Sequence, residues 1–251
     1  MNRPMNPSFP HHLAYLKLGY IAAHYEPLAA QAAEKSWPPL EYLQRLVEGE
    51  YDLRQQRAFA RRVQVARFPV VKTLDRFDWS WPTKLDELKV KNLFRLGFVA
   101  RKTNVIFCGG VGLGKSHLAS ALAYEACQRG HSVCFTTAVD ALNNLVAAHA
   151  AHRLKAELKK YLGPDVLLLD ELGYLPLDKA GADLLFQIIS QRYERGSMII
   201  TTNKAYKRWP EIFNNDAGVT SAILDRVLHH AETIVLEGKS YRMKDQIDSS
   251  N

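Results

Sequence analysis

The chain has 251 residues, 47% of them hydrophobic, and a formal net charge of +7. A chain of this length and composition can bury one substantial core, with room for a small second domain. It contains no secretory signal and no apolar run long enough to cross a bilayer, so we expect a cytoplasmic protein without a membrane span. The basic balance favours polyanionic partners, but charge alone does not identify one.

Three cysteines occur, Cys108, Cys127 and Cys134, in a predicted strand, helix and strand. Their number is odd and no C-x-x-C spacing is present, which argues against a disulfide framework. The sequence therefore predicts reduced thiols in the core, as is usual for a cytoplasmic protein.

The first part of the chain is predicted to be helical. Residues 1–10 are rich in Pro and Asn and are expected to be disordered. Apolar residues then recur at helical spacing, and Ser36, with the prolines after it, can begin a longer helix that continues to about Ala66. We expect a helical N-terminal domain over residues 1–68 that serves DNA binding or oligomerisation.

Arginines form a stripe in the later half of the long helix. Arg54, Arg57 and Arg61 lie at i, i+3 and i+7, so they share one side, and Arg62 is adjacent. This stripe suits the phosphate backbone of duplex DNA, and binding through it would weaken with salt. The alternative is an ordinary solvated helix face.

Residues 69–103 are expected to form a linker and a helix. The linker carries the aromatic residues Phe77, Trp79 and Trp81. They either pack the helical leader onto the next domain or line the adenine pocket that the following loop motif would require. Packing is the expected role.

A glycine-rich loop lies between a predicted strand, residues 104–108, and an Ala/Leu-rich helix. It matches the pattern G-x-x-x-x-G-K-[ST], and strand, loop and helix is the order that phosphate binding needs. Inward-facing N–H groups and the helix N-terminus favour the anion. Lys115 is predicted to contact the β- and γ-phosphates, and the hydroxyl of Ser116 to bind Mg²⁺. The predicted nucleotide-binding residues are Gly109, Gly110, Val111, Gly112, Leu113, Gly114, Lys115, Ser116 and His117.

Two acids end the apolar run of residues 166–169. Such a run is typical of a central parallel strand, whose last residues reach the sheet edge where α/β proteins bind ligands. Asp170 is predicted to hold the Mg²⁺ shell, and Glu171 to act as general base towards the attacking water. The alternative is an acidic surface turn.

An alanine-rich helical region precedes this strand and carries a basic cluster. We expect the cluster to face DNA in the channel of an assembled ring or spiral, the alternative being a solvated helix face. His149 and His152 have the i, i+3 spacing of metal ligands, but without a nearby acid or thiol no zinc site is expected. The basic residues are Arg153, Lys155, Lys159 and Lys160.

Asn203 ends a further predicted strand, residues 197–203. Its amide is predicted to orient the hydrolytic water beside the γ-phosphate, although Asn also commonly closes a strand into a turn. With strands at residues 131–136 and 233–236, five strands alternate with helices. This alternation predicts an α/β fold with a parallel sheet covered on both faces.

Arg226 belongs to a predicted helix just before the last strand. A guanidinium at this place can stabilise the transferring phosphoryl group of a neighbouring subunit, which makes hydrolysis depend on assembly. An ordinary helix-surface salt bridge to Asp225 or Glu232 is the alternative.

The motif series from Gly109 to Arg226, followed by the segment Gly238-Lys239-Ser240-Tyr241-Arg242, resembles the IstB family. Its members are AAA+ ATPases that assist insertion-sequence transposition, and the family is similar to the helicase loader DnaC and, more distantly, to DnaA. The resemblance implies a P-loop NTPase fold with a five-stranded parallel sheet between helices, after a small all-α N-terminal domain. The ATPase domain would span residues 104–251 with a reduced or absent lid, for which Arg242 would partly substitute.

The same resemblance implies ATP and Mg²⁺ as cofactors and three partners: duplex DNA, further copies of the chain and the transposase. Lys115, Glu171, Asn203 and Arg226 would be catalytic, with Ser116 and Asp170 at the metal. ATP would lie between subunits, assembly would prepare DNA for the transposase, and hydrolysis would reset the assembly. The chain itself would not cut DNA.

Three other functions remain open. A DnaC-type helicase loader shares the core, but its leader would grip a helicase and prefer single-stranded DNA. A small-metabolite kinase would turn over as a monomer and would need a substrate lid and an acceptor site. A switch that binds ATP but barely hydrolyses it would keep the same DNA-bound lifetime after Glu171→Gln.

Overall fold

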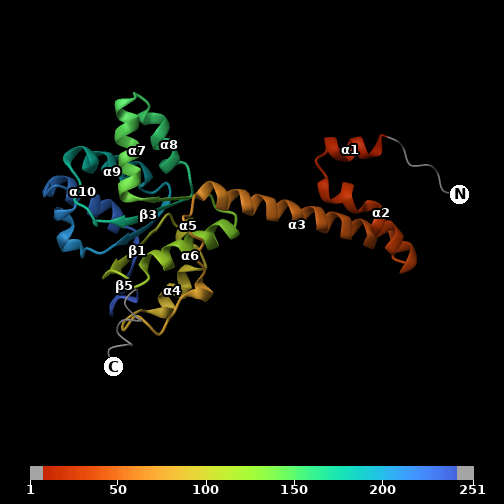
Figure 1. Cartoon of the computed structure of the whole chain (residues 1–251), viewed down its shortest axis with the longest axis horizontal. Coiled ribbons are helices and arrows are strands. Elements are labelled where there is room, and N and C mark those ends of the chain that lie inside the picture. The colour runs from red at the N-terminus through yellow and green to blue at the C-terminus, as the bar shows by residue number, and fades with distance from the viewer. Residues whose placement is uncertain (1–7, 242–251) are drawn as a thin grey trace. The chain divides into compact units, whose positions relative to one another are not determined.

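The computed structural model describes residues 8–241, which divide into one compact unit up to Arg61 and a second from Arg62 onward. The first unit contains α1 (Phe9–Tyr15), α2 (Gly19–Glu34) and most of α3 (Pro39–Ala66), as Figure 1 shows. Helix α3 confirms the expected long helix. Helix α1 already begins at Phe9, so the expected disordered start does not reach Pro10; residues 1–7 lie outside the described residues.

A buried carboxylate connects the helices of the first unit. The Glu50 carboxylate, on α3, accepts hydrogen bonds from the backbone N–H of Tyr20 (2.8 Å) and Ile21 (3.3 Å) in the first turn of α2. Arg54 pairs with Glu50 at 2.9 Å and donates to the carbonyl of Lys17 at 2.9 Å. Because few apolar side chains of this unit are buried, these polar contacts carry much of its specificity.

The second unit alternates strands with helices. Its strands are β1 (Asn104–Gly109), β2 (Val133–Thr137), β3 (Val166–Leu172), β4 (Ser197–Thr202) and β5 (Ala231–Leu236). Its helices are η1 (Leu74–Arg76), α4 (Glu87–Leu93), α5 (Gly97–Ala100), α6 (Lys115–Gln128), α7 (Ala138–Ala150), α8 (Leu154–Leu162), α9 (Lys179–Arg192), η2 (Tyr206–Glu211) and α10 (Ala217–Leu228). All five strands expected from the sequence are present, within a few residues of their expected ends.

The five strands form one parallel sheet in the order β2-β3-β4-β1-β5. The register places the carboxyl end of β1 beside that of β5 through the pair Gly109 and Leu236. It also places the end of β3 beside the end of β4 through Leu172 and Thr202. The loops after β1, β3 and β4 therefore share one edge of the sheet, where parallel α/β sheets bind ligands.

Both faces of the sheet are covered, as the fold class predicts. Alternate residues along a strand point to opposite faces. Ile106, Leu167 and Ile200 pack with helices α7 to α10 in one apolar core, while α6 packs against β1, β3 and β4 on the other face. Figure 1 shows α7 and α9 on one side of the strands and α6 on the other. The apolar run of residues 166–169, predicted to be a central strand, belongs to β3, which has a neighbouring strand on each side.

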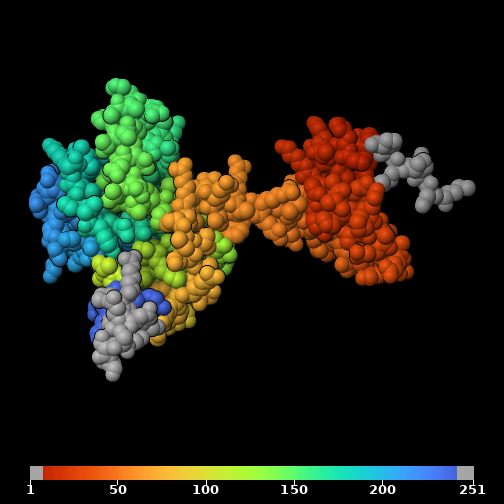
Figure 2. Space-filling view, in the orientation of Figure 1, coloured from red at the N-terminus to blue at the C-terminus, as the bar shows by residue number. Residues whose placement is uncertain are grey.

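The linker segment after α3 packs against the rest of the second unit, where Figure 2 shows it in orange to yellow. His117, in the first turn of α6, is hydrogen-bonded through Nε2 to the carbonyl of Thr73 at 2.8 Å. The N–H of Thr83 donates to the carbonyl of Glu237 at 2.9 Å. The linker is thereby fixed to the start of α6 and to the segment after β5.

Two buried polar side chains hold the amino edge of the sheet. The guanidinium of Arg192, at the end of α9, donates to four carbonyls, including those of Tyr161 (2.7 Å) and Ser197 (2.8 Å). Asn104 joins β1 to β4 through the N–H of Met198 and to the end of α10 through the carbonyl of Val227. These contacts satisfy groups that would otherwise be buried without partners.

The three cysteines lie in β1, α6 and β2, as expected, and none forms a disulfide. Cys127 is buried, and this burial raises the pKa of its thiol to about 11. Cys108 and Cys134 are half-buried, so the expectation of fully buried thiols holds for one of the three. Across residues 8–241, no helix combines the length and apolar character needed to span a membrane.

Candidate nucleotide site

The glycine loop connects β1 to α6, as its pattern predicts. Gly114 is the N-cap of α6 and has φ 89°, and Gly112 has φ 75°, a left-handed conformation that glycine adopts without strain. Lys115 is only 3% exposed, and its ammonium donates to the carbonyl of Gly110 at 2.6 Å. The loop thus holds a buried cation beside the N-terminus of a helix, an arrangement that attracts phosphate.

Two glycines of the loop also give room to neighbouring segments. A Cβ on Gly114 would lie 2.6 Å from the ring of Phe77, and one on Gly112 would clash with the side chain of Ser240. The N–H of Tyr241 donates to the carbonyl of Gly112 at 2.9 Å. The linker and the segment after β5 therefore both lie directly on the phosphate loop.

Asp170 lies at the end of β3, next to the phosphate loop. Its Oδ1 accepts hydrogen bonds from the hydroxyl of Ser116, at 2.9 Å, and from the hydroxyl of Thr201 on β4. Asp170 is 6% exposed and Thr201 is fully buried. The structure therefore brings Ser116 and Asp170 together, as two metal ligands would require.

Glu171 follows in a strained backbone position. Its φ is 60°, which is uncommon for a residue with a side chain, and the pairing of β3 with β4 shifts register between Leu169 and Leu172. The N–H of Glu171 donates to the hydroxyl of Thr201 at 2.9 Å. The hydroxyl of Thr201 therefore contacts both acidic residues: it donates to the carboxylate of Asp170 and accepts from the backbone N–H of Glu171.

Asn203 directly follows β4, so its side chain belongs to the same edge of the sheet. Its Oδ1 is buried and has no hydrogen-bond partner among the described residues. An unpaired buried carbonyl oxygen costs about 1–3 kcal/mol, so such groups usually have a functional reason. Asn203 therefore carries a buried acceptor without a described partner at this edge, and it is not among the residues that line the cavity beside the phosphate loop.

A cavity of about 330 Å³ opens beside the phosphate loop. Phe77, Trp81 and Tyr241 give it aromatic walls, and Trp81 and Tyr241 meet edge to face. Lys72, Arg76 and Lys115 supply positive charge. The linker aromatics were expected mainly to pack; Phe77 is buried against the loop, and both it and Trp81 line this cavity.

Arg226 lies at the other edge of the sheet. The Nδ2 atom of Asn104, the first residue of β1, donates to the carbonyl of Val227 at 3.0 Å, which fixes the end of α10 beside the start of β1. The half-buried Arg226 donates to the carbonyl of Ala222 and lies over the ring of Phe186. The alternative expected for Arg226 was a salt bridge to Asp225 or Glu232. Among the described residues it forms neither, and Glu232 pairs with Arg101.

The basic residues predicted to contact DNA divide into two sets. Arg57, Arg61, Lys155 and Lys159 are exposed, as is Arg153 before α8. Three others make contacts within the chain: Arg54 with Glu50 and Lys17, Arg62 with the carbonyl of Cys127 at 2.9 Å, and Lys160 with Glu157 at 2.6 Å. Sequence spacing alone did not separate these sets.

Sequence reasoning missed Thr201, the contact of Ser240 with Gly112 and the place of Tyr241 in the cavity wall. The polar run Thr201-Thr202-Asn203 at a strand end was a usable signal for Thr201, because residues at i and i+2 share a face. No local pattern predicts that the segment after β5 lies on Gly112, since this contact is made between distant residues. Arg242 lies outside the described residues.

The fold and this site define the chain as a P-loop nucleotide-binding protein of the α/β class. Within that class it belongs to the IstB family, because residues 11–249 match the family described as IstB-like ATP binding protein. A protein named as an ATP-binding protein of insertion sequence IS21 from Pseudomonas aeruginosa is 40% identical over 234 residues, covering 93% of this chain and 88% of that protein. The corresponding protein of IS5376 from Geobacillus stearothermophilus is 37% identical over 231 residues, 92% of each chain.

Solved structures agree on the fold. The DnaC helicase loader superposes with a TM-score of 0.55 at 24% identity, covering 66% of this chain and 96% of that one. AMPPCP-bound DnaA from Aquifex aeolicus gives a TM-score of 0.55 at 21% identity, covering 72% of this chain and 56% of DnaA. At these identities the likeness concerns the fold.

Proposed function

We propose that the protein hydrolyses ATP at the seam between two copies of the chain, assembles on duplex DNA in its ATP-bound state and assists the transposase of its insertion sequence. The observation that carries the proposal is the placement of Arg226. It lies at the amino edge of the sheet, whereas the phosphate loop, both acids and Asn203 lie at the carboxyl edge.

ATP fits the site by shape and charge. The triphosphate would lie against the N–H groups of the glycine loop and Lys115, and the purine would contact the aromatic walls formed by Phe77, Trp81 and Tyr241. Ser116 and Asp170 would hold Mg²⁺, and they suit it because both offer hard oxygen ligands next to the loop. Bound there, Mg²⁺ would neutralise phosphate charge.

Hydrolysis would use two residues at the ends of β3 and β4. Glu171 is among the residues that line the cavity, and its carboxylate would accept the proton of the attacking water. The unpaired amide oxygen of Asn203 would accept a hydrogen bond from the same water and orient it towards the γ-phosphate. Thr201 would hold the backbone of Glu171 in its left-handed position.

Arg226 would complete the site of a neighbouring copy. Strand β1 rises about 3.3 Å per residue, so the span from Asn104 to Gly109 is about 17 Å, longer than an arginine side chain. The side chain of Arg226 is therefore too short to act at the phosphate loop of its own copy, but it could reach the phosphate loop of a neighbouring copy. A guanidinium supplied in this way stabilises charge on the transferring phosphoryl group.

Duplex DNA would be contacted by the exposed basic residues. Arg57 and Arg61 share one side of α3, and Lys155 and Lys159 lie one turn apart on α8. Each contact with a phosphate releases counterions, so the affinity should fall steeply with salt. The names of the relatives connect the family with insertion sequences, which supports a transposase as the further partner.

The decisive experiment measures assembly mass with a 50-base-pair duplex, roughly five turns of DNA, with and without ATP. We expect an ATP-dependent complex on duplex for the parent chain and none for Lys115→Ala. Glu171→Gln should bind ATP, fail to hydrolyse it and remain longer on DNA. Turnover by a monomer would instead indicate a kinase, and an unchanged lifetime for Glu171→Gln would indicate a binding switch.

A second arm replaces the duplex by a single strand of equal length. The fold of DnaC makes a helicase loader the competing function. Stronger ATP-dependent assembly on the single strand than on the duplex would favour the loader. The charge-reversing pair Arg57→Glu and Arg61→Glu should weaken duplex binding without changing nucleotide binding.

A further inference from the structure

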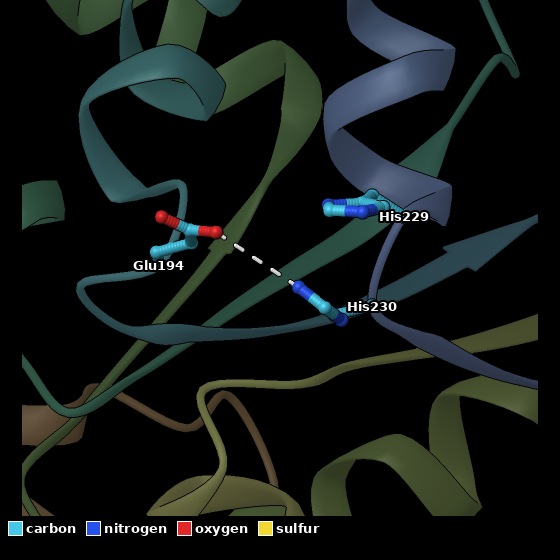
Figure 3. Close-up of side chains that lie close together, drawn as sticks. All are labelled: Glu194, His229 and His230. Carbon is cyan, nitrogen blue, oxygen red and sulfur yellow. Dashed lines mark ion pairs between the residues drawn. The ribbon is translucent and has the colours of Figure 1, made fainter.

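Three side chains outside the nucleotide site face a common space at the amino edge of the sheet. Glu194 belongs to the turn between α9 and β4, and His229 and His230 join α10 to β5. Each offers one nitrogen or carboxylate oxygen, and these ligand atoms all lie within 4.8 Å of one another. Figure 3 shows His230 pointing towards the carboxylate of Glu194, with His229 beside it.

The spacing suits a tetrahedral metal ion. Two ligand atoms about 2.1 Å from Zn²⁺ lie about 3.4 Å apart at the tetrahedral angle. The Nε2 atom of His230 and the Oε1 atom of Glu194 are 3.9 Å apart, too far for a hydrogen bond but within a small side-chain adjustment of that separation. The two histidine rings are 4.1 Å apart between centroids.

A hydrogen bond orients one of the rings. The hydroxyl of Tyr193 lies 2.6 Å from Nδ1 of His229, which leaves Nε2 of that ring for a metal. Metal-binding histidines usually have their second nitrogen held in this way, and such a partner fixes the tautomer and the ring orientation.

The backbone that carries the three ligands is anchored on both sides. Arg192, where the Glu194 turn begins, donates to four carbonyls before β3 and at the start of β4, and the N–H of Asn104 donates to the carbonyl of His230 at 2.7 Å. Glu194 has φ 59°, an uncommon conformation that this rigid turn maintains. The exposed side chains therefore project from a preorganised frame.

We propose that Glu194, His229 and His230 form a binding site for a transition-metal dication of the zinc class, with a fourth position open to solvent. Lys102 and Arg226 line the same surface hollow as Glu194 and His230. Their positive charge opposes any dication, so binding has to depend on the ligand atoms, and two imidazoles with one carboxylate are a poor set for Mg²⁺ or Ca²⁺, which prefer oxygen ligands. Imidazole nitrogens instead select Zn²⁺ and its neighbours in the transition series.

The experiment titrates untagged full-length chain with Zn²⁺ against a chromophoric chelator, without nucleotide or DNA. We expect one saturable site on the parent and its loss in the double variant His229→Ala/His230→Ala. Tyr193→Phe should weaken binding about 10-fold or more, because it removes the partner of His229. Mg²⁺ at the same concentration should not compete.

The matched control is His149→Ala/His152→Ala, which removes another exposed histidine pair at metal-compatible spacing. It should bind Zn²⁺ like the parent. Circular dichroism checks that each variant is folded, and Glu194→Gln provides a conservative second test of the site. Equal Zn²⁺ binding by the parent and the His229→Ala/His230→Ala variant, or no saturable binding to the parent, overturns the proposal. Neither result bears on the ATP site.

Discussion

A mixture of two inactive variants should hydrolyse ATP if Arg226 acts on a neighbouring copy. Arg226→Ala keeps an intact phosphate loop, and Lys115→Ala keeps an intact Arg226. The two residues lie beyond opposite ends of β1, which spans about 17 Å, so we expect that one copy cannot bring both to one triphosphate. At a seam between the two variants, an Arg226→Ala copy supplies the loop and a Lys115→Ala copy supplies the guanidinium.

The size of the rescue follows from counting seams. Arginine fingers contribute about 10³- to 10⁵-fold to turnover, so each variant alone should be almost inactive. With head-to-tail contacts and random mixing at equal amounts, about one seam in four pairs an intact loop with an intact Arg226. The mixture should therefore recover about a quarter of the parental rate per site.

The assay measures phosphate release at saturating ATP with duplex DNA, for each variant alone and for the mixture. The matched control mixes Lys115→Ala with Glu171→Ala. Both of these changes damage the same side of the seam, so no combination restores a complete site. A mixture of Arg226→Ala and Lys115→Ala that stays at the average of its components refutes the reasoning, and so does an Arg226→Ala variant with parental turnover.

Three further predictions concern side chains around the two units. Thr201→Val should lower the free energy of unfolding by about 2–4 kcal/mol in urea titrations, because Asp170 loses a hydrogen-bond donor and the N–H of Glu171 loses its acceptor. The control Thr202→Val removes one neutral hydrogen bond and should lower it by about 1 kcal/mol. Gly112→Ala should abolish the binding of fluorescent ATP, because both the φ of 75° and the side chain of Ser240 oppose a Cβ at this position. The control is Gly130→Ala: Gly130 also has a positive φ, 95°, but no atom of a non-adjacent residue lies within 4 Å of the added Cβ, so this variant shows the effect of backbone strain without a steric clash. Burial alone would raise the pKa of Glu50, but Arg54 and the N–H groups of Ile21 and Tyr20 outweigh it and hold the pKa below 4.5. The Glu50 contribution to the stability of the first unit should therefore be present above pH 4.5 and disappear as the pH falls through the lowered pKa; acid unfolding of Glu50→Gln identical to that of the parent contradicts this.

Patterns confined to a few neighbouring residues were enough to predict the sheet and the phosphate loop. The run before Asp170 is apolar at every position because both faces of that strand are buried. The loop pattern specifies its own conformation, since Gly112 and Gly114 occupy left-handed positions. Parallel pairing then brings Asp170 and Asn203 to the same edge without further information.

Contacts between distant residues could not be predicted in the same way. Spacing placed Arg54 with Arg57 and Arg61 on one side of a helix, but it could not reveal that Glu50 and the carbonyl of Lys17 engage Arg54. Spacing also suggested His149 and His152 as the pair to consider for zinc. The structure instead brings His229 and His230 to an acid 35 and 36 positions earlier in the chain.

The two edges of the sheet explain how nucleotide and assembly can be coupled in a chain of this kind. A parallel strand has its ligand-binding residues at one end, and the helix that returns to the next strand delivers its last residues to the other end. Helix α10 places Arg226 there, fixed to the start of β1 by Asn104. An Asn104→Ala variant would loosen this connection while leaving the phosphate loop intact. It should therefore lower DNA-stimulated turnover more than ATP affinity, whereas equal losses in both would show that Asn104 acts only through the stability of the sheet.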